Sequence, residues 1–168
     1  DANTTGIHNT AMGKYALSTN TTGAGNVALG ADALQASTTG ASNTAIGYNA
    51  GGAITTGQAN LCVGYNAGDY QATLTTGIGN VLVGPYCDVV SGTANDAHAF
   101  GYNLDAASGY TTVGSGGSDI RAAFGNVTWA TVSDERYKKD IVDSTTGLSF
   151  INALQPRTFK YKTLGELP

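Results

Sequence analysis

The chain repeats a tripeptide, Thr-Thr-Gly, at nearly constant intervals. The copy at Thr4 is followed by three more at 17-residue spacing, and a fifth begins 20 residues later, at Thr75. In each of these five copies an asparagine stands five residues after the first threonine, and a glycine stands four residues after that asparagine. The spacing of 17 continues to Gly101, although Ala97 replaces the asparagine there. Self-similarity at a fixed period predicts stacked units that contact their neighbours. The cores read NTAMG (9–13), NVALG (26–30), NTAIG (43–47), NLCVG (60–64), NVLVG (80–84) and AHAFG (97–101).

A unit of this length and composition predicts an all-β protein. Glycine and β-branched threonine disfavour helix. At ~3.3 Å per residue, 17 residues have a contour of roughly 56 Å, enough for two short strands and two turns. Each unit is therefore expected to form one rung of a parallel β-roll or β-helix, with rungs about 4.8 Å apart. The recurring asparagines and glycines suit turns with positive φ, and stacked asparagines can form hydrogen bonds from rung to rung.

The third and fourth positions of each core are both apolar, and neighbours on a strand point to opposite faces. The smaller residue is expected inside the narrow roll, and the larger one forms an outward stripe. Soluble proteins rarely leave a long apolar stripe exposed, so we expect other copies of the chain to cover it around a threefold axis. The inner positions are Ala11, Ala28, Ala45, Cys62, Leu82 and Ala99, and the outer stripe is Met12, Leu29, Ile46, Val63, Val83 and Phe100.

Charge and cysteine usage exclude several classes of function. Residues 1–132 carry two basic and seven acidic side chains, which argues against binding to nucleic acid phosphates. No run of about 18 apolar residues occurs, so we expect no membrane insertion. Two cysteines do not make a disulfide framework; Cys62 is expected to be buried, and Cys87 half exposed near a turn. His8 and His98 have no partner at metal-ligand spacing, so we expect no metal ion and no cofactor.

A set of tyrosines follows the core glycine by one residue. These are Tyr48, Tyr65 and Tyr102, whereas Lys14, Ala31 and Pro85 take this position in the other rungs. Such a column could contact sugar rings, or it could be a stacking ladder that supports the turn.

Two acids, Asp88 and Asp105, stand four residues after their core glycines. In adjacent rungs their carboxylates would lie about 5 Å apart, which suits a cation or a retaining glycosidase. The alternative is a pair of solvated turn residues that point apart. The 20-residue unit contains an insertion near residues 69–74, which we expect to be a surface loop that contacts a receptor.

The segments NTAIGYNAG (43–51) and NLCVGYNAG (60–68) resemble the head repeats of trimeric autotransporter adhesins, which also occur in many phage tail-fibre proteins. The resemblance covers about residues 4–105 and implies a trimeric, left-handed β-roll. We therefore assign 1–109 to this roll. Residues 110–132, with strand-like alternation and Trp129, are interpreted as a transition segment where the roll ends and the chains repack.

Charge rises abruptly after this segment, since six of the nine residues in 133–141 are charged. The pattern Ser-Asp-x-Arg-x-Lys-x-x-Ile, together with INALQPRTFKYK (151–162), resembles the start of the intramolecular chaperone domain of phage tail spikes, tail fibres and endosialidases. We expect 133–168 to be the start of this α+β domain, truncated here. The motif residues are Ser133, Asp134, Arg136, Lys138 and Ile141.

The resemblance implies that the chaperone assists trimer folding and then cuts the Val132–Ser133 bond. Ser133 would be the nucleophile and Lys138 its general base. A serine hydroxyl is too weakly acidic to attack unaided, and a desolvated lysine can take its proton. The structural alternative is a helix with Ser133 as its N-cap and Asp134 and Glu135 in its first turn.

Together these features predict the receptor-binding part of a homotrimeric phage tail fibre, in the virion tail. Its partners would be further copies of itself, other tail proteins, and a polysaccharide or outer-membrane receptor on the host. Two alternatives are a bacterial surface adhesin or extracellular filament, and a glycan-cleaving spike that uses Asp88 and Asp105. Any enzymatic activity is expected to be at most that of a self-cleaving serine endopeptidase, without other substrates.

Overall fold

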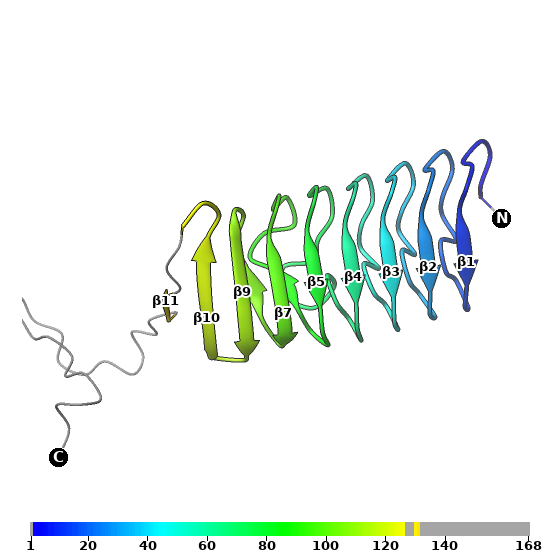
Figure 1. Ribbon diagram of the computed structural model, residues 1–168. Helices are drawn as coiled ribbons and strands as arrows, with labels where there is room; N and C mark the ends of the chain where they lie inside the picture. The colour runs from blue at the N-terminus through cyan, green and yellow to red at the C-terminus, as the bar shows by residue number, and fades with distance from the viewer. Residues whose placement is uncertain (1, 127–129, 132–168) are drawn as a thin grey trace, which may run out of the picture. The chain divides into compact units, whose positions relative to one another are not determined.

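The computed structural model describes residues 2–126 and 130–131 and shows a parallel β-solenoid of about six rungs (Figure 1). No helix occurs in this part of the chain. Short strands of consecutive rungs lie side by side in one sheet, in the order β1-β2-β3-β4-β5-β7-β9-β10-β11. The predicted all-β solenoid is therefore confirmed. The sheet strands are β1 (Thr10–Met12), β2 (Val27–Leu29), β3 (Thr44–Ile46), β4 (Leu61–Val63), β5 (Val81–Val83), β7 (His98–Tyr102), β9 (Tyr110–Ser115), β10 (Ser118–Ala123) and β11 (Ala130–Thr131).

The pairing register follows the repeat. Ala28 on β2 pairs with Ala45 on β3, 17 residues further on. Cys62 pairs with Leu82 at a separation of 20, so the longer unit leaves the sheet register unchanged. The three extra residues are therefore accommodated in a loop, as the sequence predicted.

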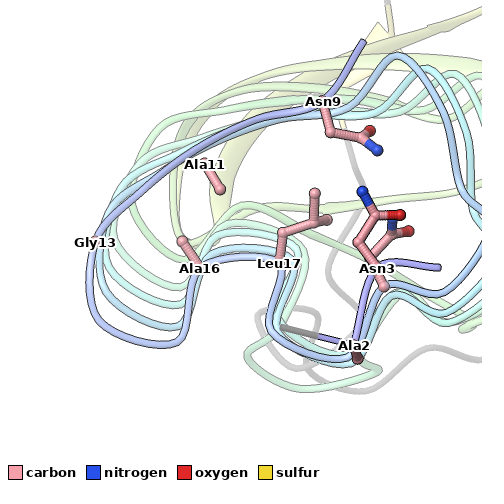
Figure 2. Close-up of a pocket in the computed structure, with 8 residues that line it drawn as sticks. Ala2, Asn3, Asn9, Ala11, Gly13, Ala16 and Leu17 are labelled. Carbon is pink, nitrogen blue, oxygen red and sulfur yellow. The ribbon is translucent and has the colours of Figure 1, made fainter. Parts of the chain in front are cut away.

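The centre of each strand points into the solenoid. Ala28, Ala45, Cys62, Leu82 and Ala99 are completely buried, which confirms the predicted inner position. Ala11 is exposed because no rung covers it in the described chain. Figure 2 shows this open end, where Ala11, Ala16 and Leu17 line the hollow from one side and Asn3 and Asn9 lie at its other end.

Interior side chains are matched in size across the narrow core. Cys62 and Leu82 are larger than the alanines of the neighbouring rungs, and glycines in the returning segments make room for them. A Cβ atom added at Gly68 would lie 2.9 Å from Sγ of Cys62 and 3.3 Å from Cδ1 of Leu82. In the second rung the same position is taken by the buried Leu34, which packs where the strands carry only alanine. This exchange of volume keeps the core close-packed despite its variable sequence.

The repeated asparagines form a continuous hydrogen-bond ladder, as predicted. The side-chain oxygen of Asn43 accepts the main-chain N–H of Asn60 at 3.0 Å, and its amide donates to the carbonyl of Gly57 at 2.8 Å. The same two bonds recur along the solenoid from Asn9 to Asn80. The ladder ends at Ala97, whose side chain has no acceptor. Each asparagine thus satisfies two buried main-chain groups that would otherwise lack partners.

The core glycines are required by close approach between rungs. Gly47 has a φ of 132°, and a Cβ atom there would lie 2.5 Å from the carbonyl oxygen of Gly64. A side chain is therefore excluded both by space and by conformation.

The chain from Tyr110 onward forms a β-hairpin that continues the sheet. Strand β9 pairs in parallel with β7 and antiparallel with β10, and Gly116 and Gly117 make the two-residue turn. Part of the predicted transition segment is therefore strand, whereas Trp129 lies outside the described residues. A second sheet, which contains β6 (Asp88–Val89) and β8 (Asp105–Ala106), pairs the two acids predicted to be adjacent.

Candidate interaction surfaces and cleavage site

The outer stripe lies on the outward face of the main sheet. Met12 is 67% exposed, and Leu29, Ile46 and Phe100 are between 38% and 42% exposed. Val113 on β9 pairs with Phe100 and extends the stripe by one strand. These side chains alternate with the buried centres of the strands, which is the pattern predicted for a sheet that another surface covers.

The predicted tyrosines form a ladder, and a fourth ring completes it. Tyr48 and Tyr65 stack with ring centroids 5.3 Å apart and an interplanar angle of 17°. Tyr86 packs edge-on against Tyr65 at 5.3 Å and against Tyr102 at 5.8 Å. We call Tyr48, Tyr65, Tyr86 and Tyr102 the tyrosine ladder. Tyr86 was missed because Pro85 holds the tyrosine position of its rung and the ring comes one residue later.

The insertion loop adds a fifth ring to this surface. Tyr70 lies 4.6 Å from Tyr86, between ring centroids. Partial burial and the neighbouring hydroxyl groups of Tyr65, Tyr102 and Tyr70 raise the pKa of Tyr86. The five tyrosines together form what we call the aromatic surface.

Asp88 and Asp105 pair in register, but they occupy different environments. Asp88 is completely buried, and its carboxylate accepts the main-chain N–H groups of Tyr70, Gln71 and Val89 at 3.0, 2.7 and 2.8 Å. Asp105 is exposed on β8. A direct glycan contact by this pair would therefore fall to Asp105, and that contact stays a prediction. Asp88 instead anchors the insertion loop, a role that the spacing of the two acids did not indicate.

Two further aspartates surround this pair. Partial desolvation, Asp88 and Asp119 raise the pKa of Asp105. Partial desolvation raises the pKa of Asp69 as well, with a smaller contribution from Asp88 and against a hydrogen bond from Asn49. The carboxyl groups of Asp69, Asp88, Asp105 and Asp119 therefore lie near enough to influence one another.

The cysteines and histidines have structural environments. Burial, with smaller effects of Asp88 and Asp69, raises the pKa of Cys62 to about 12, so its thiol is unreactive at neutral pH. Cys87 is also buried, which corrects the prediction that it is half exposed: β6 follows it directly and pairs with β8.

The ring of His98 packs against Phe124 at 4.8 Å, and His8 occupies a turn with a φ of 61°. Within 2–126 and 130–131 no three His, Cys, Asp or Glu side chains are placed to hold a metal ion.

The same part of the chain contains no helix of the length and apolarity needed to cross a membrane.

The predicted cleavage site lies outside the described residues. This holds for Val132, for the proposed nucleophile Ser133 and general base Lys138, and for the supporting residues Asp134, Arg136 and Ile141. Their assignment stays a prediction from the motif.

In a comparison with known families, the model of the chaperone-of-endosialidase family matches residues 133–166. No curated protein and no solved structure matched the chain. A chaperone-of-endosialidase segment directly after a parallel β-solenoid is consistent with a tail-spike-type protein.

Proposed function

We propose that this protein is the receptor-binding part of a homotrimeric phage tail fibre or tail spike, located in the virion tail. The observation that carries the proposal is the outer stripe, which follows the sheet from β1 to β9 and continues on β10 through Ile120, the exposed partner of Val113. The segment that matches the chaperone family begins at residue 133. An apolar face of this length suits an interface between copies of the chain. Three copies around one axis give every stripe the same covered environment and leave no free end.

The proposed role of residues 133–168 follows from how such a solenoid folds. The strands from β1 to β7 pair with segments 17 or 20 residues away, and three chains must also align in register. Folds rich in non-local strand pairing form slowly and expose sheet edges on the way. A segment that brings three chains together at one end reduces this slow folding and the exposure of sheet edges. This is the role that the family description suggests.

In the proposed cleavage, the Ser133 hydroxyl oxygen attacks the carbonyl carbon of Val132 while the Lys138 amine takes the hydroxyl proton. The peptide bond breaks, the Ser133 nitrogen receives the proton, and Val132 is left as an ester on Ser133. Water then hydrolyses this ester. The products are a solenoid ending at Val132 and a released chaperone beginning at Ser133.

The test is expression of the full-length protein, followed by intact mass and N-terminal analysis. We expect a fragment that begins at Ser133, no cutting in Ser133→Ala or Lys138→Ala, and normal cutting in the matched control Lys139→Ala. An uncut wild-type chain, or cutting that persists in Lys138→Ala, would contradict the proposed chemistry. The solution mass of the solenoid product tests trimerisation separately.

A further inference from the structure

The aromatic surface lies along one narrow edge of the solenoid. Figure 2 shows Gly13 at the turn where the chain passes from the strand that carries Ala11 to the segment that carries Ala16. The tyrosine ladder occupies the one or two positions after the equivalent glycines in later rungs. Tyr48, Tyr65, Tyr70 and Tyr102 are each between 47% and 52% exposed, so about half of each ring meets solvent.

The structure holds Tyr70 in place at some cost. Asp88 is a fully buried carboxylate, and burial of a charge is unfavourable unless hydrogen bonds compensate for it. Two of its three bonds go to the N–H groups of Tyr70 and Gln71. The buried Leu74 fixes the other end of the loop. Since a three-residue insertion would otherwise be a mobile surface loop, this anchoring gives Tyr70 a defined position on Tyr86.

We propose that the aromatic surface binds an uncharged glycan whose chain runs along the solenoid axis. The inference rests on the proposed function in attachment and names the chemical class of its ligand. Tyrosine offers a flat apolar face with negative potential and a hydroxyl at its edge. A sugar ring presents C–H groups on one face and hydroxyls at its rim, so it matches both parts. Rigid tyrosines supply this contact with little loss of side-chain entropy.

Charge selects an uncharged ligand over an acidic one. Lys14 and Arg121 are the two basic residues in the part of the chain that the structure describes, and Arg121 lies over the ring of Tyr110. Asp69 directly precedes Tyr70, and Asp105 follows Tyr102 by three residues. Partial burial first, and then the nearby Asp88, raises the pKa of both carboxyl groups. An anionic polysaccharide would meet repulsion along the tyrosine ladder. Lys14 takes the equivalent position in the first rung, two rungs before Tyr48, so it lies beyond the end of the ladder.

Individual tyrosine rings can be removed by substituting the residue that takes the equivalent position in another rung. Tyr86 adopts a left-handed backbone with a φ of 58°, and Asn49, Asn66 and Asn103 hold the equivalent position with φ near 51°. Tyr86→Asn therefore deletes the central ring but keeps a residue that suits this backbone. Tyr65→Ala likewise reproduces Ala31 of the second rung. The matched control is Tyr15→Asn, which changes the Tyr86-equivalent position in the first rung, outside the ladder.

The experiment measures binding of the full chain to immobilised dextran, mannan, galactan and chitin oligosaccharides, with dextran sulfate and polysialic acid as anionic probes. Adsorption to a panel of bacterial cells is measured in parallel. We expect wild-type protein to bind at least one neutral polymer in preference to both anionic ones. Tyr86→Asn and Tyr65→Ala should each weaken binding about tenfold, as loss of a central aromatic contact usually does. Tyr15→Asn should bind like wild type.

Each other outcome overturns the proposal in a distinguishable way. Preference for an anionic polymer, or unchanged binding by both ladder variants, refutes it and leaves attachment intact. Adsorption to cells without binding to any neutral polymer also refutes the proposed ligand and leaves the attachment function intact. If Tyr86→Asn has a lower oligomeric mass in solution than the wild type and Tyr15→Asn does not, the aromatic surface is an interface between copies of the chain. Binding to neither cells nor polymers would refute the attachment function as well.

Discussion

Replacing one asparagine of the ladder by alanine tests how the solenoid is held together. Asn43→Ala removes an acceptor for the main-chain N–H of Asn60 and a donor to the carbonyl of Gly57, at 3.0 and 2.8 Å. Both groups are buried, and a buried group without a partner costs roughly 1–3 kcal/mol. We therefore expect the free energy of unfolding to fall by about 4 kcal/mol.

The matched control is Asn9→Ala, at the open end of the solenoid. Asn9 makes the equivalent two bonds, at 2.9 Å from the N–H of Asn26 and 2.7 Å to the carbonyl of Gly23. Its side chain lines the open end of the interior, where water can replace it. Each bond then contributes a net value near 1 kcal/mol, so we expect a loss of about 2 kcal/mol.

Urea unfolding followed by circular dichroism, at one fixed protein concentration, measures both values. Losses of unfolding free energy that agree within about 0.5 kcal/mol for the two variants would refute this reasoning, because burial of the asparagine ladder would then not matter. An unchanged free energy of unfolding in Asn43→Ala would refute it more strongly, since the asparagine ladder would then contribute nothing to stability.

Three further substitutions test other parts of the structure. Gly47→Ala should lower the thermal midpoint sharply, because φ at Gly47 is 132° and an added Cβ atom would lie 2.5 Å from the carbonyl oxygen of Gly64. Gly117→Ala should leave the midpoint unchanged, because an added Cβ atom there has no neighbour within 4 Å. Equal effects of the two substitutions would contradict the close approach of the rungs. Asp88→Ala should let chymotrypsin cut after Tyr70 in the folded protein, because the insertion loop loses two hydrogen bonds. If this variant resists chymotrypsin as well as Asp105→Ala does, Asp88 does not anchor the insertion loop. Asp105→Asn should stabilise the protein at pH 7, because a raised pKa means that folding disfavours the ionised carboxylate. This gain should vanish below about pH 4, where the carboxyl is protonated in both states, and a gain that persists at pH 3 would contradict it.

The repeat could be predicted from the sequence because its most regular residues make contacts between rungs. An asparagine whose oxygen meets the N–H of Asn60 must recur at the spacing of the rungs, and a glycine that faces another glycine must do the same. The inward and outward positions followed from strand alternation alone. The extra length of one unit did not obscure the pattern, because the loop absorbs it.

The aromatic surface could be predicted only in part. Tyr48, Tyr65 and Tyr102 share one position in the repeat, but Tyr86 reaches the ladder from the next position and Tyr70 from an insertion. Asp88 was recognised for its spacing to Asp105, whereas its role depends on two N–H groups of a loop about 17 residues earlier. Such contacts arise from side-chain direction and loop path, which a periodic pattern does not encode.

The mass of the Ser133→Ala protein in solution, by sedimentation equilibrium at micromolar concentration, tests the central claim most directly. This variant should remain uncut, so one species should be present. If the outer stripe is an interface between copies, the mass will be three times the 17.0 kDa of the chain. A stable species of 17.0 kDa would show that the stripe is exposed in the free protein, and it would contradict the proposed trimeric fibre.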